Sequence, residues 1–135
     1  MRRVLYDVNV ILDVLLNREP HYGASAGALE AVARGKVEGY IAGHAITTIA
    51  YLLQRQLGSS GSLAVLNELL SKMKIAPVTD SSIRRALISK IKDFEDAVSH
   101  AAAEEAGMTL IVTRNVRDFS KGTIPAVLPE TFHIE

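Results

Sequence analysis

Short apolar runs alternate with helix-favouring stretches along the whole chain, and this alternation constrains the fold more than any other feature. The apolar runs predict β-strands at residues 4–6, 37–42, 74–78, 109–112 and 126–128. The segments between them predict helices at residues 10–16, 20–34, 45–57, 62–73, 79–91 and 93–107. Strands separated by helices indicate βαβ units. We therefore expect an α/β fold, in which a mostly parallel sheet of four to five short strands carries helices on both faces.

Glycines and capping residues mark the expected helix ends. Gly35 and Gly58 follow helix-favouring segments and are expected to stop them. Thr79 begins a polar stretch that offers N-caps for the helix at 79–91. Asp93 is expected to begin the next helix, and Gly107 to end it.

Composition excludes several classes of protein. The chain has 135 residues, the size of one domain, and we expect residues 1–135 to form a single domain. It contains no cysteine, so disulfide scaffolds, thiolate zinc sites and cysteine nucleophiles are excluded. Its 15 basic and 15 acidic residues give a formal net charge of zero. This balance disfavours a histone-like nucleic-acid binder, because such binding depends on many cationic contacts to phosphates.

The N-terminal segment resembles a signal peptide only at first sight. Arg2 and Arg3 precede an apolar stretch, but Asp7, Asn9 and Asp13 interrupt it. No apolar run in the chain approaches the roughly 18–20 residues that a membrane span needs. We interpret the segment as part of the fold, and expect a cytoplasmic protein with no membrane partner.

Three polar segments are candidates for a functional site, because ligands of open parallel sheets bind beyond the carboxyl ends of the strands. Asp7 and Asn9 follow the first expected strand. Residues 113–119 follow the fourth, and residues 93–96 begin the helix before it. A parallel sheet would bring these three segments to one edge.

Each acidic residue also has a purely structural interpretation. Asp7 could cap the helix that follows it, although its largely apolar neighbours favour a functional role for a carboxylate whose burial is costly. Asp93 is a good N-cap, and Asp96 three residues later could make a capping-box-like contact or pair with His100. Asp118 could pair with a neighbouring arginine. On local grounds alone, capping is the favoured interpretation of the acids at 93–96.

The combination of these acids carries more information than any one of them. Carboxylates that converge at one sheet edge repel one another, and a hard cation such as Mg²⁺ or Mn²⁺ makes the arrangement tolerable. A metal held by carboxylates beside a phosphate is suited to hydrolysis by metal-activated water.

Four stretches of the sequence resemble PIN domains, and the resemblance extends over essentially the whole chain. The opening stretch is Leu5–Asp13 (LYDVNVILD), and Ile46–Leu53 (ITTIAYLL) resembles the middle helix of the family. The second half resembles it through Asp93–Val98 (DFEDAV) and Ile111–Phe119 (IVTRNVRDF). The resemblance implies a three-layer α/β/α sandwich. It also implies an Mg²⁺- or Mn²⁺-dependent ribonuclease, as in the VapC-type toxins of toxin–antitoxin pairs.

The resemblance assigns roles to particular residues. It makes Asp7, Asp96 and Asp118 the candidate catalytic and metal-binding residues. The supporting residues that it implies are Asn9, Asp93, Thr113 and Asn115, and the substrate-binding candidates beside them are Arg114 and Arg117. It also implies an RNA substrate, a protein antitoxin and a homodimer. For the homodimer, the sequence offers an apolar region of Tyr40, Ile41, Tyr51 and Leu52, which could equally be core.

The sequence departs from the family pattern at two positions. Many PIN nucleases carry a glutamate near the position of Thr48, whereas no acid lies between Gly39 and Leu66 here. Asn115 stands where many relatives carry an aspartate. Fewer charged ligands should weaken metal affinity, so we expect weaker activity than in the fullest version of the site.

Charge along the chain is segregated in a way that suits RNA. Residues 72–92 hold six basic residues and one acid, whereas residues 93–105 hold five acids and no lysine or arginine. Basic residues around an acidic, metal-binding centre would position phosphates. A solvated helix face is an equally good interpretation of the same pattern.

Two further hypotheses remain open from sequence. Asp7-Val8-Asn9 faintly resembles the Asp-x-Asp nucleophile loop of haloacid dehalogenases, but the second acid is missing and the chain is short for that fold with its cap. Alternatively, the chain is a non-catalytic PIN-like module that binds RNA or protein, as the missing middle acid and Asn115 would suggest.

Overall fold

The computed structural model describes residues 1–132 and is built on a five-stranded sheet in which every pair of neighbouring strands is parallel. The strands lie in the order β3-β2-β1-β4-β5. Their bounds are β1 Arg3–Tyr6, β2 Glu38–Ala42, β3 Lys74–Ala76, β4 Leu110–Val112 and β5 Ala126–Val127. The predicted parallel sheet is therefore confirmed, and each strand lies within or close to its expected range.

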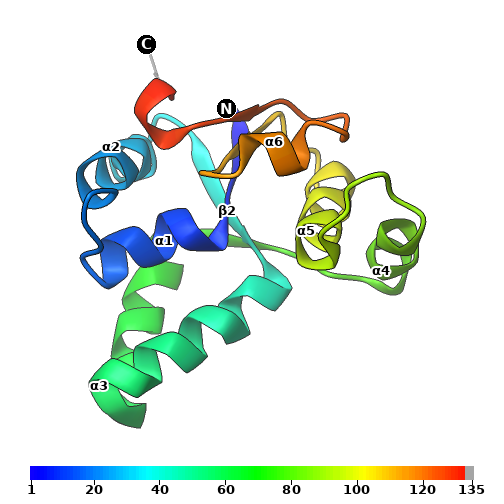
Figure 1. Cartoon of the computed structure of the whole chain (residues 1–135). Coiled ribbons are helices and arrows are strands. Elements are labelled where there is room, and N and C mark those ends of the chain that lie inside the picture. The colour runs from blue at the N-terminus through cyan, green and yellow to red at the C-terminus, as the bar shows by residue number, and fades with distance from the viewer. Residues whose placement is uncertain (133–135) are drawn as a thin grey trace.

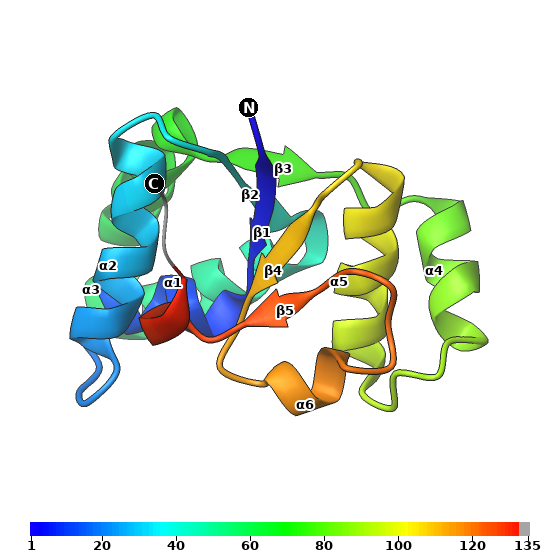
Figure 2. The same cartoon turned by 90° about the horizontal axis from the view of Figure 1, so that it is seen from above.

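Helices connect the strands and cover both faces of the sheet (Figures 1 and 2). In the view of Figure 2, α1, α2 and α3 lie on one side of the sheet, and α4 and α5 on the other. The bounds are α1 Val8–Leu15, α2 Tyr22–Ala33, α3 Gly43–Lys72, α4 Asp80–Leu87, α5 Phe94–Glu105, α6 Val116–Phe119 and the 3₁₀ helix η1 Pro129–Thr131. The architecture is the expected three-layer α/β/α sandwich.

Strand β1 shows how the sequence generates two cores. Successive side chains of a strand point to opposite faces of a sheet. Val4 and Tyr6 accordingly pack into the core shared with α1, α2 and α3, while Leu5 packs into the core shared with α4 and α5. All three side chains are at most 1% exposed. Burial on both faces explains why the strand reads as an uninterrupted apolar run.

Gly58 interrupts the helical segment as predicted. The range Gly43–Lys72, labelled α3, consists of two helical halves that meet at Gly58, whose φ of 76° and ψ of 175° are non-helical. The helices differ from the sequence prediction in two places. Helix α4 ends at Leu87 and not near residue 91. The short helix α6 was not predicted, because four residues are too few to show a helical period.

The order of the strands places the end of β1 at a special point. Strand β1 pairs with β2 on one side and with β4 on the other, so the connections lead away from it in both directions. Ligands of open α/β sheets bind at such a switch point, beyond the carboxyl ends of the strands. Asp7 is the first residue beyond β1.

Among residues 1–132, we find no helix that is both long and apolar enough to cross a bilayer.

Candidate active site

Asp7 is held rigidly at the end of β1. Its side chain is 6% exposed, and its backbone N–H donates to the carbonyl of Val112 at 2.9 Å, which continues the β1–β4 pairing. The N–H of Val8 donates to Oδ1 at 2.8 Å, and the hydroxyl of Thr113 donates to Oδ2 at 2.7 Å. Asp7 is thus the N-cap of α1, as its structural interpretation predicted.

Burial raises the pKa of Asp7 above its ordinary value. The hydrogen bonds from Thr113 and Val8 oppose this rise, as does the positive charge of Arg114, whereas the charge of Asp93 adds to it. Two donors therefore orient a carboxylate that the interior would otherwise disfavour.

The first turn of α5 brings further carboxylates to Asp7. Asp93 is the N-cap of α5, and its Oδ1 accepts from the N–H of Asp96 at 2.9 Å, as its structural interpretation predicted. Asp96 is partly buried, and its pKa is raised to about 7, first by desolvation and then by the charges of Asp7, Asp93, Asp118 and Glu95. The charges of Asp7 and Asp118 both act on Asp96, so the three predicted carboxylates lie near one another at this end of the sheet.

The turn after β4 completes the site. Thr113 is fully buried, and its Oγ1, while donating to Asp7, accepts from the N–H of Asn115 at 2.9 Å. The carbonyl of Asn115 accepts in turn from the N–H of Asp118 at 3.0 Å. The side chains of Asn115 and Asp118 are exposed. Thr113 therefore links the β4–α6 turn directly to Asp7.

The donor set suits a hard divalent cation. Carboxylate oxygens dominate it, and these are the ligands that Mg²⁺ and Mn²⁺ prefer. Within residues 1–132, no three His, Asp or Glu side chains lie close enough together to form a ready-made metal site. Mg²⁺ is usually bound through one or two carboxylates and keeps several waters. Asp7 and Asp96 could supply such direct ligands, with Asp118 in the outer shell.

The remaining predicted residues occupy different surroundings. Oδ1 of Asn9 accepts from Nη1 of Arg18 at 3.4 Å. Arg117 is exposed on α6. Arg114 is only partly exposed, because its guanidinium lies against Asp13, with Nη2 3.2 Å from Oδ1 and Nε 3.0 Å from Oδ2.

Asp13 is a charged residue whose role the sequence did not reveal. It is fully buried, and its Oδ2 also accepts from the hydroxyl of Ser25 at 2.9 Å. A buried carboxylate needs partners, and Arg114 and Ser25 supply them. The apolar residues around Asp13 in α1 were the available signal, since a lone acid within a buried helix face implies a distant partner.

The predicted pairing of Asp96 with His100 is wrong. His100 is 5% exposed, and its Nε2 accepts from the N–H groups of Thr123 at 3.0 Å and Ile124 at 3.2 Å. Its Nδ1 faces Glu104 at 3.6 Å, one turn further along α5. Desolvation lowers the pKa of His100, which keeps the ring neutral as these contacts require.

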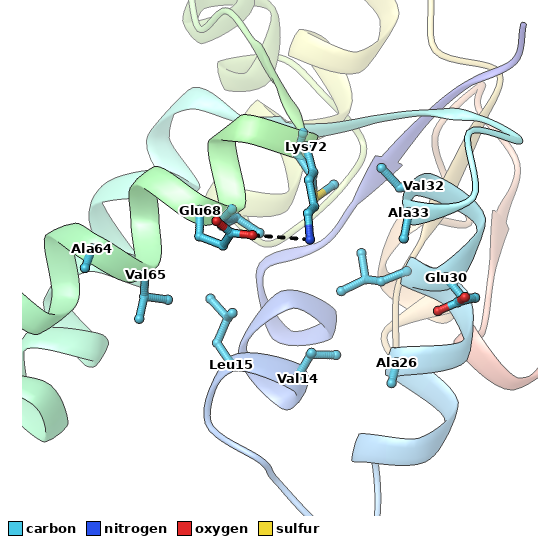
Figure 3. A pocket seen from close by; sticks show the side chains of 13 residues that line it. Val14, Leu15, Ala26, Glu30, Val32, Ala33, Ala64, Val65, Glu68 and Lys72 are labelled. Carbon is cyan, nitrogen blue, oxygen red and sulfur yellow. Dashed lines mark ion pairs between the residues drawn. The ribbon is translucent and has the colours of Figure 1, made fainter.

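An apolar cavity of about 510 Å³ lies away from the carboxylates, between α1, α2 and the second half of α3 (Figure 3). Val14 and Leu15 of α1 face Val65 of α3 across it. The ion pair of Glu68 and Lys72, at 3.3 Å, lies beside it. None of the candidate site residues lines this cavity, and its lining is mainly apolar.

Fold and site together define a class: an α/β/α domain with an acidic cluster at the switch point of a parallel sheet. The family model for the PIN domain matches residues 3–117, and the chain belongs to this family. The predicted resemblance is thereby confirmed. Membership also argues against the haloacid dehalogenase alternative.

Individual relatives support the same assignment. The chain is 24% identical to "Ribonuclease VapC1" of Aquifex aeolicus (strain VF5) over 96% of this chain and 92% of that protein. Among solved structures, FitAB bound to an IR36 DNA fragment matches with a TM-score of 0.73 and 15% identity, covering 96% of this chain and 97% of that one. A toxin–antitoxin complex from Klebsiella pneumoniae matches with a TM-score of 0.71 and 21% identity, covering 93% of this chain and 97% of that one. These structural likenesses show a shared fold.

Proposed function

We propose that this protein is a metal-dependent endoribonuclease that hydrolyses RNA phosphodiester bonds as the toxin of a toxin–antitoxin pair. The observation that carries the proposal is the proximity of Asp7, Asp96 and Asp118 at the switch point, where desolvation and then the charges of neighbouring acids raise the pKa of Asp96 to about 7. Such repulsion is costly for the protein alone and is relieved by a cation. The ribonuclease name of the Aquifex relative supports the same activity.

The side chains have distinct parts in this proposal. Asp7 would be a direct ligand, oriented by Thr113 and Val8. Asp96 can hold or release a proton near neutral pH, and would be a ligand when ionised. Asp118 and Asn115 would act at the exposed rim, where RNA has access. When bound, Mg²⁺ or Mn²⁺ supplies Lewis-acid chemistry and a water of lowered pKa. Hydrolysis of the phosphodiester joins the oxygen of a water to phosphorus and releases a sugar hydroxyl.

Cleavage of RNA tests this proposal. Purified protein, freed of any partner, is incubated with single-stranded and structured RNA in Mg²⁺, Mn²⁺ or EDTA, beside Asp96→Asn and a control, Glu95→Gln. Glu95 is an exposed acid adjacent to Asp96 in the same helical turn. We expect metal-dependent cleavage that Asp96→Asn abolishes and Glu95→Gln retains. Cleavage by Asp96→Asn at the wild-type rate would refute the assigned site.

A non-catalytic PIN-like module is the second candidate. One observation favours it: residues 1–132 contain no preformed group of three metal-holding side chains. Thr48, near the position of the family's middle glutamate, is partly buried in α3 and carries no charge. Binding of RNA without cleavage in Mn²⁺ would select this candidate.

The protein partners in this proposal are an antitoxin and a second copy of the chain. Several structural neighbours are toxin–antitoxin complexes, which supports the antitoxin. Of the region considered for a homodimer, Tyr40 and Ile41 belong to the core, whereas Tyr51 is 61% exposed. Expression of the wild-type chain in a bacterial host should arrest growth, and Asp96→Asn should not. A protein that binds tagged Asp96→Asn and relieves this arrest would be the antitoxin.

A further inference from the structure

A second, polar cleft lies against the turn after β4, the turn whose Thr113 donates to Asp7. It has a volume of about 210 Å³, and its lining includes His21, Arg114, Asn115, Leu128 and Glu130. Asn115 belongs to the same turn as Thr113, which holds Asp7. When the phosphate of a substrate lies at the carboxylates, a neighbouring nucleotide can therefore reach this cleft.

Arg114 forms a fixed wall of this cleft and not a free anion anchor. Two of its nitrogens face the buried carboxylate of Asp13, and Nη1 lies 3.2 Å from Nε2 of His21. The charge of Arg114 is thus compensated within the protein. Since an arginine has only donors, its contact requires His21 to accept through Nε2. The other ring nitrogen of His21 then carries the proton and is a donor.

The remaining lining disfavours a phosphate and favours a base. Glu130 is exposed, and its carboxylate would repel a phosphate but accept hydrogen bonds from the N–H groups of a base. The amide of Asn115 both donates and accepts. Leu128, 36% exposed, provides an apolar surface for the face of a base. Recognition of single-stranded RNA commonly combines contact with the base face and hydrogen bonds to its edge.

We infer that this cleft receives an unpaired nucleobase next to the scissile phosphate, and that Glu130 and His21 determine which base is accepted. The inference rests on the proposed ribonuclease function and adds a specificity subsite to it. It restricts the substrate to RNA that is single-stranded at the cut, since a paired base cannot present its edge to the cleft.

The test compares base preferences, not overall rates. Wild-type protein, Glu130→Gln and His21→Ala cleave a randomised single-stranded RNA pool in Mn²⁺, and the product ends are sequenced. The control is Glu68→Gln, the same change on an exposed glutamate beside the apolar cavity. We expect Glu130→Gln to change the base preference at one position beside the cut by about ten-fold. This is the effect expected from the loss of one hydrogen bond to a charged group. In Glu68→Gln, both the base preference and the total cleavage should stay within about three-fold of the wild type.

Binding without metal separates the possible failures. Short homopolymers of A, C, G and U are titrated in EDTA into the wild-type protein, Glu130→Gln and His21→Ala. A changed order of affinities in either variant supports the subsite even if cleavage proves slow. If the wild type and both variants show the same base preference in cleavage or in binding, the subsite is overturned. The proposed nuclease activity is not affected by that result. A wild-type protein that neither cuts nor binds RNA overturns both proposals.

Discussion

Replacing Asp96 by asparagine should stabilise the metal-free protein above neutral pH. The pKa of Asp96 rises from the ordinary 3.8 to about 7 in the folded chain. At about 1.4 kcal/mol per pH unit, this rise corresponds to about 4 kcal/mol of unfavourable free energy when the side chain is ionised. Asp96 is only partly buried, and solvent and salt screen the repulsion, so we expect about 2 kcal/mol.

The sign follows from proton linkage. Between the unfolded pKa of 3.8 and the folded value of about 7, the folded protein binds more protons at Asp96 than the unfolded chain does. The contribution of Asp96 to stability is therefore present at low pH and is lost as the pH rises through about 7. The asparagine side chain of the variant does not titrate. The gain in unfolding free energy of Asp96→Asn over the wild type should therefore be near zero at pH 4 and reach its full value at pH 8.

Urea denaturation in EDTA measures this difference, with Glu95→Gln as the control. Stabilities are compared as differences between variants at each pH, because His100 also contributes a pH dependence. The lowered pKa of His100 makes the folded state less stable as the pH falls through 6.5. Saturating Mn²⁺ should make the wild type more stable than Asp96→Asn at pH 8, since only the wild type gains binding energy. An equal effect of Asp96→Asn at pH 4 and pH 8 would refute the reasoning.

Three further substitutions test separate parts of the structure. Thr113→Val removes a hydrogen bond to the Asp7 carboxylate and should weaken Mn²⁺ binding about ten-fold by calorimetry. Gly122→Ala places a Cβ atom within the ring of His100 and should cost about 1–3 kcal/mol in urea denaturation. Arg114→Ala leaves the buried Asp13 without its cation and should cost about 3–5 kcal/mol, measured in the same way.

Matched controls separate these effects from general disturbance. Gly27 of α2 has open space around its Cα, so Gly27→Ala should stabilise the protein by about 0.5–1 kcal/mol. Arg117→Ala removes an exposed arginine and should change stability by no more than about 0.5 kcal/mol. A Gly122→Ala protein as stable as Gly27→Ala, or an Arg114→Ala protein as stable as Arg117→Ala, would contradict the packing described here.

Sequence patterns were sufficient for the sheet and for the location of the acids. A run such as Val4–Tyr6 is apolar because both faces of β1 are buried, and Asp7 is conspicuous because it ends that run. Parallel pairing then brings the residues beyond β1 and β4 together. Local signals thus suffice where one strand end determines the position of a side chain.

Contacts between distant segments were not accessible in the same way. The partner of Asp13 is Arg114, 101 residues later, and no local pattern connects them. His100 was assigned to Asp96 by helical spacing, but backbone N–H groups of the later loop at 123–124 bind its ring. In each case tertiary packing outweighs the local preference.

The central claim is that Asp7 and Asp96 together hold a divalent cation, and a calorimetric titration tests it most directly. Mn²⁺ is titrated at pH 8 into the wild-type protein, Asp7→Asn and Glu95→Gln. The account predicts saturable binding by the wild type and by Glu95→Gln, weakened at least about 100-fold in Asp7→Asn. Binding of equal strength by the wild type and Asp7→Asn would contradict it.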